Sequence, residues 1–263
     1  MLGVDDGRSR MSMAMNFQSR DFPRKGKAKY VAPAANDVLV LSLGGILAES
    51  GRAALADNQL DLLRSGGKTQ GVPIYATGDT SLFKKPCVSI VGTRDVSEEG
   101  AARARRLARE RWHAGGVIVS GLAKGVDTAA LTAAIEAGGR TIAVIGTPLS
   151  KAYPAENARL QEEIYSTQLL LTPFREGETV YKSNFPKRNR VMAAISDATV
   201  IIEASDTSGT LHQAAECQRL GRWLFIAKSV VDDDSLTWPK RFIGQQRVVI
   251  LEKTDDVVRR IKY

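Results

Sequence analysis

From Pro73 onward, short aliphatic segments alternate with segments of helical periodicity, and this alternation allows few folds. The short segments are rich in β-branched and aliphatic residues without a polar residue at every second position, which is typical of strands buried on both faces of a sheet. Seven strands are predicted, at residues 88–91, 117–120, 141–145, 169–171, 199–203, 223–227 and 248–251. Helices are predicted between them, at residues 97–114, 124–137, 156–165, 188–196 and 209–220. The pattern predicts an α/β fold with a doubly wound, mostly parallel sheet.

The residues before this alternation divide into two predicted units. Residues 1–36 lack apolar periodicity and contain seven Lys and Arg residues against three Asp residues, so we predict a disordered basic tail. Residues 37–72 contain apolar residues at helical spacing and end near a Gly-Gly pair, so we predict a small helical unit.

The overall charge favours a polyanionic partner. The 263 residues include 37 Lys and Arg against 29 Asp and Glu, a net charge of +8, although basic proteins without such a partner are common. Cys87 and Cys217 stand far apart without metal-ligand spacing, which predicts a reduced, cytoplasmic protein with no metal site. No apolar run approaches the ~20 residues of a transmembrane helix, so no membrane partner is expected.

Two basic or hydroxyl-rich segments precede predicted helices. Lys187, Arg188 and Arg190 lie in the segment Asn-Phe-Pro-Lys-Arg-Asn-Arg, and Ser208-Gly209-Thr210 follows the strand predicted at residues 199–203. Helix starts present unpaired N–H groups and a positive dipole end, which suit phosphate. Together they predict a site for a phosphorylated ligand or a nucleic-acid backbone. An ordinary helix cap would leave the same Ser-Gly-Thr sequence.

Two more turns follow predicted strands. In Gly92-Thr93-Arg94 the glycine allows a tight turn and Arg94 supplies a planar fork for phosphate, although a surface arginine would look the same. The turn from Ser120 through Gly121 and Lys124 to Gly125 has small residues that let a backbone approach and one cation, although a plain strand–helix turn would also fit. It lacks the Gly-Lys-Ser/Thr ending of a Walker loop. Since parallel strands end at one edge of a sheet, we expect all these turns to converge.

No hydrolytic arrangement is evident. The acids Asp127, Asp197 and Glu203 are dispersed, and Asp127 is expected to bond within its own turn. His212 lies one turn into a predicted helix, beside Ser208 and Thr210, and a structural role is favoured over contact with a ligand. We therefore predict no catalytic residue and no cofactor.

In this order, the motifs resemble the DNA-processing protein A family (DprA, also called Smf), a family of Rossmann-like DNA recombination mediators. The resemblance runs from about residue 73 to about residue 230. It is carried by Ile90 to Arg94, Ser120 to Asp127, Thr141 to Val144, Tyr153-Pro154, Phe185 to Arg190, and Ser208 to Leu211.

The resemblance implies a Rossmann-like domain over residues 73–263, a homodimer, and binding and protection of single-stranded DNA. It also implies that the protein assists the loading of a RecA-type recombinase in transformation or another DNA process. Phe185 or Tyr153 could stack a base. The residues expected to contact DNA are Arg94, Ser120, Gly121, Lys124, Lys187, Arg188, Arg190, Ser208, Gly209 and Thr210.

Two other functions could use the same fold. Related nucleotide phosphoribohydrolases carry a catalytic Glu where this chain has Gln213, and glutamine cannot act as a general base. A sensor of a small nucleotide signal would need no chemistry at all. The positive charge favours DNA over the sensor.

Overall fold

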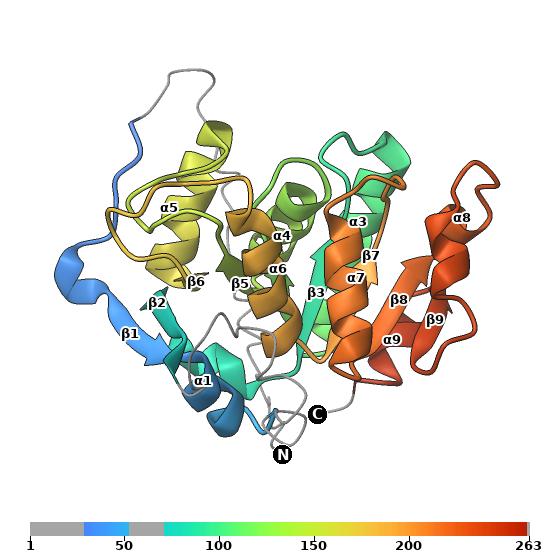
Figure 1. Cartoon of the computed structure of the whole chain (residues 1–263), viewed down its shortest axis with the longest axis horizontal. Coiled ribbons are helices and arrows are strands. Elements are labelled where there is room, and N and C mark those ends of the chain that lie inside the picture. The colour runs from blue at the N-terminus through green and yellow to red at the C-terminus, as the bar shows by residue number, and fades with distance from the viewer. Residues whose placement is uncertain (1–28, 53–70, 262–263) are drawn as a thin grey trace, which may run out of the picture.

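In the described part of the chain, nine strands form one mixed sheet in the order β1-β2-β6-β5-β4-β3-β7-β8-β9 (Figure 1). The computed structural model describes residues 29–52 and 71–261. From β6 to β9 every neighbouring pair is parallel, whereas β1 pairs with β2 and β2 with β6 in antiparallel register. The strands are β1 (Leu39–Ser42), β2 (Pro73–Gly78), β3 (Cys87–Val91), β4 (Val117–Ser120), β5 (Arg140–Val144), β6 (Leu169–Thr172), β7 (Ala198–Ile201), β8 (Trp223–Ala227) and β9 (Val248–Leu251).

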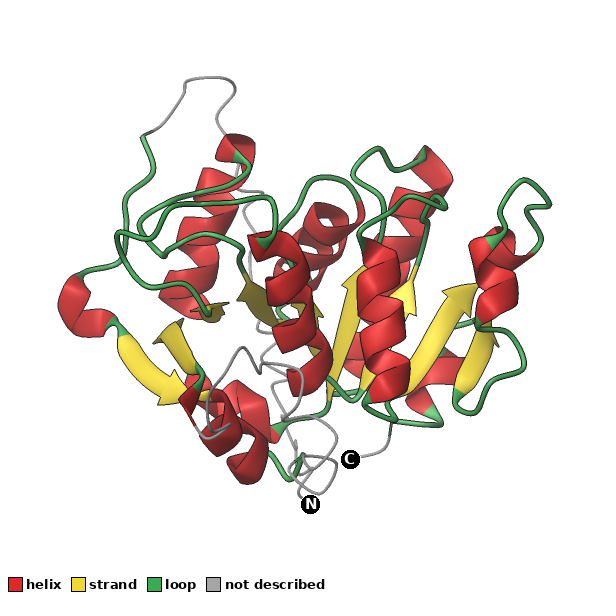
Figure 2. Cartoon of the chain, viewed as in Figure 1, coloured by secondary structure: helices red, strands yellow, loops and turns green. Residues whose placement is uncertain are grey.

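Helices cover both faces of this sheet (Figure 2). Successive strand residues point to opposite faces, so Val88 and Ile90 join one buried cluster while Cys87 and Val91 join another. The helices are α1 (Leu43–Glu49), α3 (Glu98–His113), α4 (Val126–Glu136), α5 (Ala158–Thr167), α6 (Asn184–Ile195), α7 (Thr210–Arg219), α8 (Lys228–Val231) and α9 (Asp255–Val258). The predicted α/β, doubly wound, mostly parallel sheet is confirmed, and the seven predicted strands lie within two residues of observed ones.

The chain order creates a switch point at the middle of the sheet. From β3 the chain builds outward through β4, β5 and β6, and it then returns to the other side of β3 to add β7, β8 and β9. The connections after β3 and β7 therefore leave on opposite faces, which opens a crevice at the carboxyl ends of these two strands.

The N-terminal unit differs from the prediction. Residues 39–42, expected to be helical, form the edge strand β1, and only Leu43–Glu49 is helical within the described part of this unit. The aliphatic residues Leu39 and Val40 pair with Ala76 and Tyr75 of β2, a distant partner that local helical spacing does not show. The helix expected between residues 53 and 63 lies outside the described residues.

The predicted disordered tail is also wrong at its end. Most of it, residues 1–28, lies outside the described residues, but Tyr30 and Val31 contact α5. The Tyr30 hydroxyl donates to the Leu149 carbonyl at 2.7 Å, and the amide of Val31 donates to the Glu162 carboxylate at 2.7 Å. Long-range hydrogen bonds of this kind offset the conformational entropy that the segment loses when it becomes ordered. The composition of the segment does not reveal these bonds.

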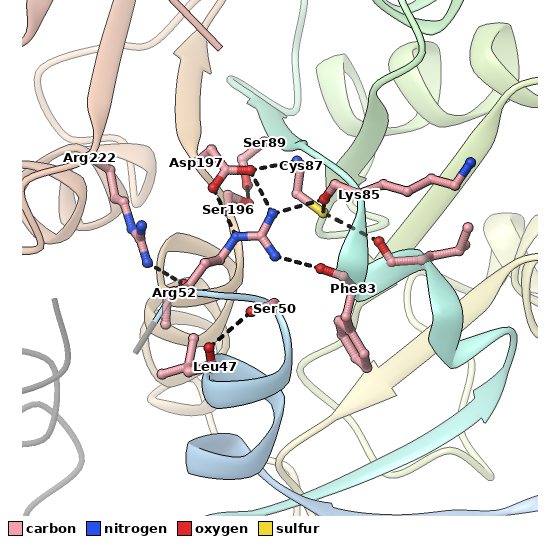
Figure 3. Close-up of polar contacts among 12 residues, drawn as sticks. Leu47, Ser50, Arg52, Phe83, Lys85, Cys87, Ser89, Ser196, Asp197 and Arg222 are labelled. Carbon is pink, nitrogen blue, oxygen red and sulfur yellow. Dashed lines mark hydrogen bonds and ion pairs between the residues drawn. The ribbon is translucent and has the colours of Figure 1, made fainter. Parts of the chain in front are cut away.

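Arg52, which follows α1, connects this helix to the N-terminal ends of β3 and β7 (Figure 3). Its guanidinium forms a two-point contact with the Asp197 carboxylate at 2.9 and 2.6 Å, and it also donates to the carbonyls of Phe83 and Lys85. The same carboxylate accepts from the amide of Cys87 at 2.8 Å. One arginine thus joins the chain segments that enter β3 and β7, at the edge opposite the switch-point crevice.

Arg52→Ala is expected to lower the free energy of unfolding by about 2 kcal/mol, because it removes one partner of an ion pair that is largely buried. The Arg52 side chain is 5% exposed and that of Asp197 is 26% exposed, so water offsets part of the loss. Chemical denaturation measures the change, with the exposed Arg105→Ala on α3 as the matched control. Equal stability of the two variants would contradict this role.

Candidate nucleic-acid interface

A cavity of about 290 Å³ opens at the switch point and defines the candidate site. Four segments that the sequence singled out line it: the turn after β3, the turn after β4, the first half of α6 and the start of α7. The lining residues are Val91, Gly92, Thr93, Arg94, Ala123, Asp127, Phe185, Pro186, Arg188, Asn189, Met192, Ser205, Ser208, Gly209, Thr210 and Gln213. The convergence expected from strand order is confirmed.

The turn after β3 places Arg94 at the mouth of this switch-point cavity. A Cβ on Gly92 would lie 2.5 Å from the Val126 side chain and 2.8 Å from the Glu203 carbonyl, so only glycine allows the turn to pack this closely. The Thr93 amide donates to the same carbonyl at 2.7 Å. Arg94 is exposed, and its guanidinium lies 5.7 Å from the centre of the Phe185 ring. A fork-shaped cation held over an aromatic ring suits a phosphate beside a base.

Ser208, Gly209 and Thr210 form the wall at the start of α7. The Ser208 hydroxyl accepts from the Thr210 amide at 3.2 Å, and the Thr210 hydroxyl donates to the Gly92 carbonyl at 3.3 Å. The side chain of Asn189 on α6 donates to the Gly209 carbonyl at 3.3 Å. The Ser208 and Thr210 hydroxyls thus bond to the protein backbone and fix the shape of the wall, as expected if this sequence serves as an ordinary helix cap. Their contact with a ligand stays a prediction.

Arg188 lies in the floor of the cavity and not on its rim. Its side chain is 6% exposed, and its Nη1 donates to the Val144 carbonyl at 3.1 Å and lies 3.9 Å from the Asp127 carboxylate. A Cβ on Gly121 would fall 1.2 Å from this Nη1, so any side chain at this position would displace the guanidinium. Burial lowers the pKa of Arg188, and the charge of Asp127 offsets part of this change.

Asp127 holds the turn after β4 and faces Arg188. Its carboxylate accepts from the amides of Gly121 at 3.1 Å and Ala123 at 3.3 Å, which confirms the expected bonding within its own turn. Burial raises the pKa of the Asp127 carboxyl, and the Arg188 guanidinium and the two amides offset part of the rise. The pair is an internal brace for the cavity floor.

The structure corrects one other expected contact, that of the Ser120 side chain, and leaves the contact of Lys124 a prediction. The Ser120 side chain is fully buried and donates to the Ile90 carbonyl at 2.7 Å, so it stitches β4 to β3 and does not face a ligand. Lys124 is exposed, but its amine pairs with the Glu156 carboxylate at 2.8 Å, which reduces the charge it can offer. Lys187 and Arg190 lie on the exposed side of α6.

Aromatic rings extend the site along the carboxyl edge of the sheet. The Tyr153 and Phe185 rings lie 5.4 Å apart at 46°, and Tyr153 is 48% exposed. A Cβ on Gly146 would lie 2.8 Å from the Phe185 ring, so this glycine, which the sequence reasoning passed over, lets the ring pack against the strand end. A smaller cavity of about 30 Å³ between Tyr153, Phe185 and Arg94 adjoins the first.

Two buried polar atoms in the cavity lining have no protein partner among the described residues. They are Arg188 Nε and Gln213 Oε1, and both residues are at most 5% exposed overall. An unpaired buried donor or acceptor costs about 1–3 kcal/mol, so such atoms at a cavity favour a polar occupant. Gln213 also donates weakly to the Thr199 hydroxyl at 3.4 Å.

Two features are absent from residues 29–52 and 71–261. This part of the chain contains no cluster of three His, Cys, Asp or Glu side chains that could hold a metal ion. None of its helices is both long and apolar enough to cross a bilayer.

The fold and cavity define a Rossmann-like α/β protein with a polar ligand site at its switch point. The family model of DNA recombination-mediator protein A matches residues 61–262, so the chain belongs to that family. Among curated relatives, the DNA processing protein DprA of Streptococcus pneumoniae is 41% identical over 162 residues, which are 61% of this chain and 57% of that protein. DprA of Bacillus subtilis is 32% identical over 183 residues, 69% of this chain and 62% of that protein.

Solved structures agree with this assignment. The S. pneumoniae DprA structure superposes with a TM-score of 0.67 at 33% identity, covering 78% of this chain and 70% of that one. DprA from Helicobacter pylori, described for its single-stranded DNA binding mode, gives 0.66 at 27% identity over 76% of this chain and 90% of that one. The chain therefore spans about three fifths of the two curated relatives' lengths and more of the solved structures.

Proposed function

We propose that this protein binds single-stranded DNA at the switch-point cavity and acts as a recombination mediator. The observation that carries the proposal is the exposed Arg94 stacked on Phe185 at the mouth of a polar cavity, in a chain of the DNA recombination-mediator family. Cations grip phosphates without reading sequence, and aromatic rings stack any base. The resulting binding would be strong at low salt and nearly independent of sequence.

The partners belong to the same proposal. A mediator of this family would protect the strand and assist the loading of a RecA-type recombinase in transformation or another DNA process. A homodimer would bring two cavities onto one strand and raise its affinity through effective concentration. A cytoplasmic location fits a protein that meets both the strand and the recombinase.

Competition binding tests the proposal against its rival. A labelled oligothymidylate is bound to the protein and displaced by unlabelled single-stranded DNA, by duplex DNA or by nucleoside monophosphates. We expect single strands to compete far better than the other two. If a mononucleotide displaced the label as effectively as a single strand does, the result would favour a sensor of a small nucleotide. That function is the second candidate because Gln213 and Arg188 each have an unpaired polar atom in a cavity of nucleotide size.

Hydrolysis of nucleoside monophosphates is not expected. Gln213 occupies the position where a phosphoribohydrolase needs its catalytic acid, and an amide neither accepts nor delivers a proton at neutral pH. Chromatography of a nucleotide incubated with the protein should show no free base above the rate without protein. Base release that disappears in Gln213→Ala would contradict the assignment as a binding protein.

A further inference from the structure

A second groove adjoins the small cavity between Tyr153, Phe185 and Arg94. Its volume is about 500 Å³, and it is lined by the start of the described chain, the loop after β5 and the segment before α6. Lys29 and Tyr30 form one wall, and Lys151 and Tyr153 form another. We call residues 29–31 the strap and this opening the strap groove.

The strap is a fixed wall. The Tyr30 hydroxyl donates to the Leu149 carbonyl at 2.7 Å and accepts from the Gln161 side chain at 2.8 Å. The Tyr165 hydroxyl donates to the Val31 carbonyl at 2.9 Å. Burial raises the pKa of Tyr30 to about 12, so its hydroxyl stays protonated and keeps donating across the physiological range.

Tyr153 links the strap groove to the proposed DNA site. Its side chain lines both this groove and the small cavity beside Arg94, and its ring lies 5.4 Å from Phe185. A continuous row of side chains therefore leads from the switch-point cavity to the strap groove, in the spatial order Arg94, Phe185, Tyr153. A ring that is 48% exposed at such a junction offers a stacking face.

The groove also carries positive charge where a backbone would pass. Lys29 and Lys151 are both exposed, and the hydroxyls of Thr147 and Ser150 add polar lining. Two carboxylates also lie near the groove and accept from neutral donors: Glu162 from the strap amide of Val31, and Glu176 from the Ser150 hydroxyl.

The alternative route out of the cavity is less suitable. A groove of about 360 Å³ over the ends of β8 and β9 contains Arg103, Arg106, Lys228 and Lys253, but it has no aromatic lining. It shares no lining residue with the small cavity beside Arg94, whereas the strap groove shares Tyr153 with it. Lys228 is paired with Asp232 at 3.1 Å, and Arg103 donates to the Ser229 hydroxyl at 2.6 Å.

We propose that the strap groove takes the nucleotides that follow the one held at the switch point. Lys29 and Lys151 would contact their phosphates, and Tyr153 would stack the base at the junction. This inference rests on the proposed DNA binding, and it gives the strand a direction over the molecule, from β3 toward β6 and away from β9.

The test compares two charge reversals of equal size on oligothymidylates of about 3 and about 12 nucleotides. In Lys29→Glu/Lys151→Glu, the affinity for the longer strand should fall at least about tenfold at low salt and its log–log salt slope should fall by about 1.4, two contacts at about 0.7 each. Affinity for the shorter strand, read by competition, should fall much less, because that strand occupies the switch-point cavity and reaches only the near end of the strap groove. The matched control Lys240→Glu/Lys253→Glu should bind both strands like the wild type.

Two results of this binding experiment would contradict the role of the strap groove. Equal losses in the two double variants, or an unchanged affinity of the strap variant for the longer strand, would overturn the inference. A wild-type protein that binds neither strand would instead contradict the proposed function itself. Tyr153→Phe should retain the affinity for the longer strand that Tyr153→Ala loses, since stacking needs the ring and not the hydroxyl.

Discussion

Gly121→Ala is expected to lower the free energy of unfolding by about 3 kcal/mol and the Tm by roughly 10 °C. The added Cβ would lie 1.2 Å from Arg188 Nη1, so the guanidinium must leave its place. It would lose the hydrogen bond to the Val144 carbonyl and its position near the Asp127 carboxylate. Asp127 would then be a buried charge without its cation, which is the costly half of a broken buried pair. Because Arg188 forms the cavity floor, DNA affinity should fall as well.

A double-mutant cycle isolates this mechanism from a general effect of alanine. Arg188→Ala removes the side chain that the new Cβ would strike, so Gly121→Ala should cost little more in that background. Gly209→Ala serves as the stability control, because Gly209 has a helical φ of −60° and no atom lies within 4 Å of its Cβ position. Additive losses in the double variant would show that Gly121 and Arg188 act independently.

Arg94→Ala is expected to weaken single-stranded DNA binding by about 10- to 100-fold at low salt without changing the Tm. Arg94 is exposed and stacks on Phe185, so its loss leaves no buried group unpaired. The salt slope should fall by about 0.7 if the guanidinium meets one phosphate. Arg94→Lys should recover only part of the affinity, because an ammonium keeps the charge and loses the planar fork.

Fluorescence anisotropy at several salt concentrations measures both quantities, and Arg105→Ala on the exposed side of α3 is the control for losing one positive charge. If Arg94→Ala lost its melting transition while its folded fraction kept full affinity, Arg94 would be structural. A loss of the same size in Arg105→Ala would assign the effect to net charge alone.

The sheet could be predicted because its strands are buried on both faces. Strands such as β4 and β8 are short, almost wholly apolar segments between helices, and that pattern depends only on neighbouring residues. β1 could not be predicted in this way, since Leu39 and Val40 become a strand only by pairing with β2, more than thirty residues later. The gathering of turns at one edge followed from strand order and was therefore predictable as well.

The orientation of Arg188 was not predicted, although the sequence contains a signal for it. The helix was expected to begin at Arg188, whereas α6 begins at Asn184, with Pro186 in its first turn, where proline is tolerated. Counted from Asn184, Arg188 and Met192 follow at intervals of four residues and lie on the buried side. Lys187 and Arg190 lie off this stripe and stay exposed. The contact between Gly121 and Arg188 joins distant segments, so only the folded structure reveals it.

The most direct measurement of the central claim is the salt dependence of binding to a single strand by the full chain. The affinity for an oligothymidylate of about 12 nucleotides is measured between low and moderate salt, and the logarithm of the association constant is plotted against the logarithm of the salt concentration. Several phosphate contacts at about 0.7 each predict a line with a slope of roughly −2 to −4, and Arg94→Ala should make it shallower. Binding that is independent of salt, or no binding at low salt, would contradict the account.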